Sequence, residues 1–168
     1  PGPASRRKGY ELTLFYKPLN WLGIDAVYTH NRTRALDSPD GAYIEQSLES
    51  AGEIGISMTK NKLEASLRVR YMGPYPLVAD NSVRADANTM VNLRGAYTIG
   101  KVQVYGELLN AFDEHGKDVV YWYPAYVAGL DPPGLTSNDI DCDSGAVNCR
   151  MSRAVEPRTL RVGAKVRF

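Results

Sequence analysis

The chain has no long hydrophobic run, almost no excess charge, and only two cysteines and two histidines among its 168 residues. Its 20 Lys and Arg against 19 Asp and Glu leave a formal net charge of +1, which gives no reason to expect a nucleic-acid partner. A mean hydropathy of -0.34 and the lack of about 20 consecutive apolar residues exclude a transmembrane helix. They do not exclude membrane-crossing strands, because such strands turn only half of their residues toward lipid.

Motifs for catalysis or cofactor binding are also lacking. No G-x-S-x-G, P-loop or dinucleotide motif occurs. His30 and His115 have no metal-ligand spacing to each other, which favours structural or solvated roles. Residues Asn138–Asp143 resemble a calcium loop, but Ser144 and Arg150 stand where an EF-hand needs Gly and Glu. We therefore predict no catalytic residues, no cofactor and no metal site, with a different loop-type calcium site as a minor alternative.

The most informative pattern lies at the C-terminal end, where residues 159–168 alternate without a fault. The even-numbered residues are apolar: Leu160, Val162, Ala164, Val166 and Phe168. The odd-numbered residues are polar, charged or glycine: Thr159, Arg161, Gly163, Lys165 and Arg167. A strand places these two sets on opposite faces. One apolar and one cationic face over about 9–11 residues is typical of a strand in a transmembrane β-barrel.

The same alternation predicts antiparallel strands along the whole chain and no helix. The expected strands are Gly9–Lys17, Trp21–Arg32, Gly52–Lys60, Lys62–Met72, Asn88–Ile99, Val102–Asn110 and Thr159–Phe168. Short turns alternate with long connections, as an up-and-down meander requires. The predicted fold is therefore all-β, an antiparallel up-and-down transmembrane β-barrel segment of about seven strands, with short periplasmic turns and long extracellular loops.

A soluble antiparallel β-barrel or sandwich that binds a small ligand is the alternative, since such folds alternate in the same way. Charges deep in the expected strands, including Glu64, Arg68 and Glu107, favour the membrane interpretation, because a small soluble barrel would bury either them or the aliphatic set. An odd number of strands cannot close a bacterial barrel, and open edges are costly in lipid. We therefore expect further strands N-terminal to this sequence.

Several segments, in order along the chain, carry a resemblance to a known family. They are Gly9–Leu12 (GYEL), Arg70–Gly73 (RYMG), Val91–Tyr97 (VNLRGAY), Glu107–Glu114 (ELLNAFDE) and Glu156–Thr159 (EPRT) before a final Arg-Phe. The fourth resembles the E-N-L-F-D-[KR] segment near the end of TonB-dependent outer-membrane receptors, with Ala111 in place of the usual Leu. The others resemble neighbouring strands of the same family.

The resemblance implies that residues 1–168 are the C-terminal part of such a receptor's β-barrel domain, without the plug domain. The chain begins at Pro1-Gly2 rather than Met, in agreement with this expectation. The intact protein would reside in the outer membrane and take up a scarce ligand of the siderophore-iron, cobalamin or oligosaccharide class. Its partners would be outer-membrane lipid, that small-molecule ligand, an inner-membrane energy-coupling protein reached through the missing N-terminal part, and the barrel assembly machinery. The assembly machinery would recognise the terminal Phe168.

Two groups of residues are candidates for contact with a ligand or a plug. Arg68, Arg70 and Arg94 belong to the polar face and could meet an anionic ligand, a plug domain or solvent. The aromatic stretch Tyr121, Trp122, Tyr123 and Tyr126 could form a ligand platform at the barrel mouth, because aromatic side chains give large contact area at low entropic cost. Packing at the interface or within loops is the alternative for these aromatics.

Cys142 and Cys149 lie close together in a polar stretch within the longest connection. Their spacing permits a local disulfide, two free thiols or, less readily, metal ligation. A disulfide would stiffen an extracellular loop and so reduce the entropy lost on ligand binding.

Overall fold

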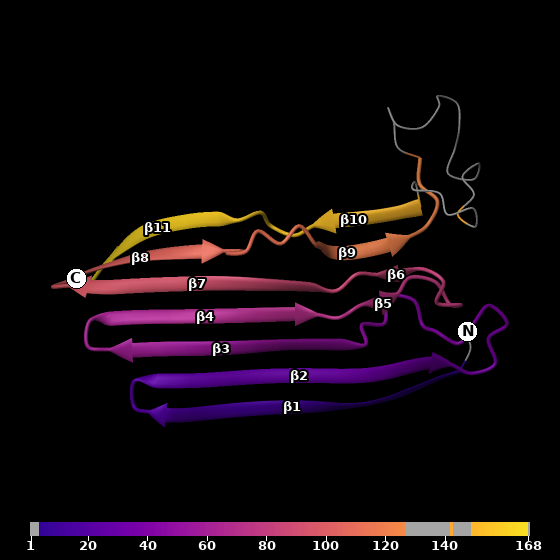
Figure 1. The fold of residues 1–168 in the computed structure, drawn as a ribbon, viewed down its shortest axis with the longest axis horizontal. Helices are drawn as coiled ribbons and strands as arrows, with labels where there is room; N and C mark the ends of the chain where they lie inside the picture. The colour runs from indigo at the N-terminus through magenta and orange to yellow at the C-terminus, as the bar shows by residue number, and fades with distance from the viewer. Residues whose placement is uncertain (1–3, 127–141, 143–148, 168) are drawn as a thin grey trace.

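A single antiparallel sheet of seven long strands dominates the computed structural model, which describes residues 4–126, 142 and 149–167 (Figure 1). Its strands, in spatial order, are β1 (Ser5–Leu19), β2 (Leu22–Ala35), β3 (Ser50–Lys60), β4 (Leu63–Met72), β7 (Asn88–Ile99), β8 (Val102–Leu109) and β11 (Thr159–Val166). The prediction of an all-β, antiparallel, up-and-down fold with seven strands is confirmed. The outer strands β1 and β11 pair only on one side within the described residues.

Two-residue turns connect the strands at one end of the sheet, and long connections join them at the other. The turns are residues 20–21, 61–62 and 100–101, and they lie at the same end as the C-terminus (Figure 1). Asn61 and Gly100 have positive φ values of 58°, a conformation that Asn and Gly adopt more readily than other residues. The predicted alternation of short and long connections is therefore present.

The first hairpin is longer than the sequence pattern predicts. β1 begins at Ser5 rather than Gly9, so it includes the basic run Arg6–Lys8, and β2 continues to Ala35. Pro18 lies in β1 at the point where the register with β2 shifts, between Tyr16 and Leu19. Proline has no N–H for the ladder, which accounts for an irregularity at this position.

The register places apolar residues side by side across all seven strands. One aligned row consists of Leu14, Ala26, Ile54, Val69 and Val91, and a second row near the other edge consists of Tyr97, Val104 and Ala164. We call this surface the apolar face. The opposite surface, which carries Asp25, Glu53, Arg68, Arg94 and Glu107, is called the charged face.

No second layer covers the apolar face within the described part of the chain. Leu12 is 60% exposed, Leu160 72% and Val162 77%. Water-soluble domains bury such a face against another sheet or against helices. Among the described residues, no helix is long and apolar enough to cross a membrane.

The long connections contain two short ladders that the sequence does not predict. β5 (Tyr75–Pro76) pairs with β6 (Arg84–Ala85), and β9 (Lys117–Trp122) pairs with β10 (Arg150–Ala154). Strands of two to six residues are too short to show a period, so pattern analysis assigns them to loops. β9 and β10 continue beyond β8 and β11 at the long-connection end (Figure 1), but they form a sheet of their own.

The hydrophobic core of the described residues lies among these connections rather than on the sheet. We call it the loop core; it consists of Tyr75, Leu77, Ala85 and Val120, with Leu48, Val83 and Trp122 packed against it. The Tyr75 hydroxyl accepts a 2.9 Å hydrogen bond from the Val120 N–H and donates to the Val120 carbonyl at 3.4 Å. These bonds tie the second long connection to β9, 45 residues away.

A carboxylate beside the loop core joins three segments. Glu49, just before β3, pairs with Arg84 of β6 at 2.6 Å and with Arg34 of β2 at 3.3 Å. Burial alone would raise the pKa of Glu49, but the hydrogen bonds and positive charges of Arg84 and Arg34 outweigh it and hold that pKa below its usual value.

The lowered pKa of Glu49 predicts an acid-sensitive connection between the long loops. Because the pKa is lower in the folded state, the ion pairs stabilise the fold fully above the ordinary glutamate pKa of about 4.3, and this stabilisation is lost as pH falls through the lowered folded pKa. The protection of the amides in residues 75–85, measured as their exchange rate relative to the intrinsic rate at each pH, should therefore fall over that acid range. In Glu49→Gln the same amides should exchange faster at neutral pH, because the ion pairs with Arg84 and Arg34 are already lost. Their protection should then no longer depend on pH through this carboxylate. Unchanged exchange at neutral pH would show that the Glu49 ion pairs do not hold the loops together.

Candidate functional site

The charged face carries ion pairs that cross several strands. The Arg68 guanidinium of β4 contacts Glu53 of β3 at 2.6 Å and Asp25 of β2 at 3.1 Å. Gly55 lies between them, and a Cβ at this position would come within 2.6 Å of an Asp25 carboxylate oxygen. The glycine therefore leaves room for a guanidinium that spans three strands.

A second group of charges lies near the other edge of the sheet. Arg94 of β7 contacts Glu107 of β8 at 3.1 Å and Glu64 of β4 at 3.9 Å, and its guanidinium lies 5.3 Å from the Tyr105 ring centre. The Tyr105 ring passes over Gly163 of β11, where a Cβ would approach it to 2.5 Å. Arg94 is thus held by neighbours on its own face, and the structure does not bring it to Arg68 or Arg70.

Arg68 and Arg70 do meet, at a polar hollow of about 340 Å³ between the sheet and the segment after β10. The hollow is lined by charged residues of both signs: Arg68, Arg70 and Arg153 against Glu53, Asp118 and Glu156. Arg70 contacts Asp118 at 3.4 Å, and Arg153 contacts the same carboxylate at 2.5 Å. Because cations and carboxylates balance, this surface can hold water and polar ligand groups and does not select strongly for one sign of charge.

The predicted aromatic group is divided between two sides of β9. Trp122 packs against the loop core with Val120. Tyr121 and Tyr123 lie on the other side, exposed, with ring centres 6.3 Å apart in an edge-to-face arrangement. Tyr126 is exposed as well. Tyr121 and Tyr123 therefore form a pair without Trp122, because alternate residues of a strand point to opposite sides.

The other candidate residues fall in different places. Cys142 and Cys149 are joined by a disulfide, with their Cα atoms 5.7 Å apart. His30 is in β2, with its ring centre 5.6 Å from that of Tyr10, and His115 is exposed after β8. Phe168 lies outside the described residues, as does the calcium-like segment 138–143 apart from Cys142. Among the described residues, no group of three or more His, Cys, Asp or Glu could hold a metal ion.

Asn110 is a structural residue whose role the sequence motif did not reveal. It directly follows β8, has a positive φ of 48° and is fully buried. Its side-chain amide donates to the carbonyls of Glu114 at 2.9 Å and Glu156 at 3.0 Å, and its side-chain oxygen accepts from the Glu114 N–H at 2.8 Å. Its own N–H donates to the Asn92 side chain at 2.9 Å. Asn110 thereby fixes the start of the longest connection to the segment before β11.

Neither a scan against protein-family models nor a search of curated proteins finds a match. Among solved structures, the chain is similar to the ferric yersiniabactin uptake receptor FyuA from Yersinia pestis, with a TM-score of 0.72 and 14% identity. It is also similar to the copper transporter OprC, with a TM-score of 0.63 and 18% identity.

Both comparisons cover 98% of this chain and 24% of the other chain. The chain has the fold of a segment of these two proteins. It therefore spans about a quarter of the length of the solved structures that it matches. The fold that the sequence pattern and the resemblance predict is confirmed, and at this level of identity the similarity concerns the fold alone.

Removing the Asn110 amide should destabilise the connection between β8 and β11. Asn110→Ala leaves the Glu114 N–H and the Glu114 and Glu156 carbonyls without this partner and forces alanine into positive φ, so we expect a loss of about 2–4 kcal/mol. Urea unfolding in detergent should show the loss. Asn92→Ala, which removes one of these bonds from the same cluster, should cost less; equal losses would contradict the role assigned to Asn110.

The Arg68 cluster should show coupling between its members. In Arg68→Gln, Asp25 and Glu53 remain as neighbouring carboxylates without their cation, so we expect a loss of about 1 kcal/mol, which Glu53→Gln in the same chain partly restores. A double-mutant cycle on the unfolding midpoint measures this coupling. Strictly additive losses would show that the two side chains do not interact in solution.

Proposed function

We propose that this sheet is part of the wall of an outer-membrane receptor barrel, with its apolar face against lipid and its charged face toward the lumen. The observation that carries the proposal is the opposite character of the two faces: aligned, exposed aliphatic side chains on one and partly exposed ion pairs on the other. In lipid the apolar face needs no second protein layer, whereas in water it would remain uncovered.

Dimensions support this arrangement. On β4 the apolar face runs from Leu63 to Tyr71, eight residue steps, which is about 27 Å along the strand. A strand tilted in a barrel wall shortens this along the membrane normal toward the apolar band of about 25 Å typical of such barrels. The soluble alternative, a sandwich or closed barrel that binds a small ligand, would need a second layer or closure that the described residues do not provide.

The proposed protein is longer than the given sequence. The free edges of β1 and β11 expose backbone N–H and C=O groups, which lipid cannot satisfy, so further strands of the same polypeptide would pair with them. The sequence resemblance and the similarity to an uptake receptor and a copper transporter support a role in transport rather than catalysis. We place this protein among TonB-dependent receptors, with energy-coupled uptake of a siderophore-iron, cobalamin or oligosaccharide ligand as its function.

Within that function the hollow beside Arg68 and Arg70 would face a plug domain or the passing ligand, and Tyr121, Tyr123 and Tyr126 would lie near the barrel mouth. Uptake of labelled ferric siderophores, cobalamin and oligosaccharides by cells with and without the gene tests the ligand class. Cell fractionation, with detection by an antibody to residues 156–168, tests the membrane location and the length of the polypeptide. A species well above 18.5 kDa that needs detergent for extraction is expected, and a soluble 18.5 kDa species would overturn the proposal.

Charge placed on the apolar face should block assembly in lipid, whereas the same charge on the other face should not. Ile56 and Ser57 are neighbours in β3 on opposite faces. An arginine at the membrane midplane of a barrel costs about 2–4 kcal/mol on the lipid side and little on the lumen side. Ile56→Arg should therefore reduce the folded fraction in lipid vesicles, and Ser57→Arg should leave it nearly unchanged. Equal effects of the two variants would contradict the assignment of the faces.

A further inference from the structure

Four cations stand together on the apolar face at the long-connection end of the first hairpin. Arg6 lies opposite Arg34, and Lys8 lies opposite Arg32, in the register of β1 and β2. All four occupy the same face as Leu12, because they are separated from it and from its partner Tyr28 by even numbers of residues. Like charges directly opposite each other destabilise a strand pair. An anion bound beside the four side chains would reduce this repulsion.

The described part of the chain supplies an anion to only one of the four. Arg34 contacts Glu49 and lies over the Tyr43 ring. Arg6, Lys8 and Arg32 are exposed and form no ion pair with any described carboxylate. With Arg34 and Leu36 they line a hollow of about 230 Å³. Three positive charges thus border a space large enough for a phosphate group.

Aromatic side chains follow next along the same face. The Tyr10 ring centre lies 6.2 Å from that of Tyr28 and 5.6 Å from that of His30. Aromatic residues of this kind mark the level of the lipid headgroups in membrane proteins. The cations therefore lie on the water side of this belt, at the depth where lipid phosphates would be found.

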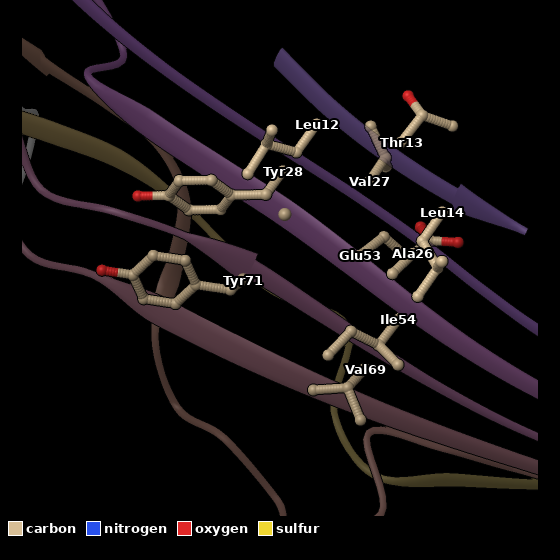
Figure 2. A pocket seen from close by; sticks show the side chains of 11 residues that line it. Leu12, Thr13, Leu14, Ala26, Val27, Tyr28, Glu53, Ile54, Val69 and Tyr71 are labelled. Atoms are coloured by element: carbon tan, nitrogen blue, oxygen red, sulfur yellow. The ribbon is translucent and has the colours of Figure 1, made fainter. Parts of the chain in front are cut away.

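An apolar hollow of about 360 Å³ lies on the other side of the belt (Figure 2). Gly52, whose partners are Tyr28 on β2 and Tyr71 on β4, is among its lining residues, and a Cβ on Gly52 would come within 3.1 Å of the Tyr28 ring. Figure 2 shows the Tyr28 and Tyr71 rings with their hydroxyls pointing to the same side, and Ile54 and Val69 also line the hollow. A lipid acyl chain suits this hollow because both are apolar, and we call the hollow the acyl-chain groove.

The two hollows are close enough for one molecule to occupy both. Lys8 and Leu12 are four residues apart on β1, a distance of about 13 Å. We propose that the apolar face of β1–β4 binds a phospholipid of net negative charge, whose phosphate contacts Arg6, Lys8 and Arg32 and whose acyl chain lies in the apolar groove lined by Leu12, Ala26 and Ile54. Guanidinium groups donate paired hydrogen bonds to phosphate oxygens, and three cations without a described carboxylate partner favour a headgroup of net negative charge over a zwitterionic one, whose own cation offsets its phosphate. The inference rests on the proposed membrane location.

Native mass spectrometry of the intact detergent-purified protein, mixed with equal amounts of phosphatidylglycerol and phosphatidylcholine, tests the preference for an anionic headgroup. We expect retained phosphatidylglycerol, with an apparent affinity about tenfold weaker in the triple variant Arg6→Gln/Lys8→Gln/Arg32→Gln. Arg7→Gln is the matched control, because Arg7 lies between Arg6 and Lys8 on the opposite face. Excess inorganic phosphate should not displace the lipid. Equal retention of both lipids by the unaltered protein, or equal losses per charge in the Arg7 control, would overturn the proposal.

A second pair of variants tests the acyl-chain groove. Ala26 lines the groove, whereas Ala65 lies on the same face of β4 outside it. Ala26→Leu should reduce lipid retention several-fold, and Ala65→Leu should not; equal retention in both variants would refute the groove as the chain site. Failure of the membrane location would appear separately as a soluble protein in fractionation. A protein that resides in the membrane but shows no lipid preference would refute the lipid site alone.

Discussion

The in-register backbone ladder from β1 to β11 is the constraint on which the rest of this structure depends. Side chains alternate along each strand, so a slip of one residue would exchange the two faces of that strand. The observed register keeps aliphatic residues in line across seven strands and places Asp25, Glu53, Arg68 and Arg94 on the opposite face. The apolar and charged faces are both consequences of this one alignment.

The stabilising contacts outside the sheet are concentrated at its long-connection end. The loop core, the Glu49 ion pairs and the hydrogen bonds of Asn110 all join segments that are far apart in sequence. At the other end, two-residue turns suffice. The sheet thus provides a regular wall, and the connections form a separately packed structure above it. In the proposed receptor, this packed end would face the ligand.

Much of this arrangement could be predicted from the sequence because a period of two is visible wherever strands are long. The seven strands and the alternation of turns follow from that pattern. β5, β6, β9 and β10 could not be predicted, because their pairing depends on the loop core rather than on any local period. The separation of Arg94 from Arg68 and Arg70, and of Trp122 from Tyr121, likewise depends on cross-strand neighbours that composition does not specify. Asn110 belongs to the segment Glu107–Glu114 that carries the family resemblance, but the sequence did not reveal that its side chain joins the segments on either side of the longest connection.

Photolabelling of native membranes tests the central claim, that the apolar face meets lipid, most directly. A diazirine carried on a phospholipid acyl chain labels the residues it touches, and peptide mass spectrometry locates them without altering the protein. We expect labelling of β4 with a period of two, at Leu63, Leu67 and Val69, and no labelling at Ser66 or Arg68. Labelling of both sets, or of neither, would contradict the proposed orientation of this sheet in a membrane.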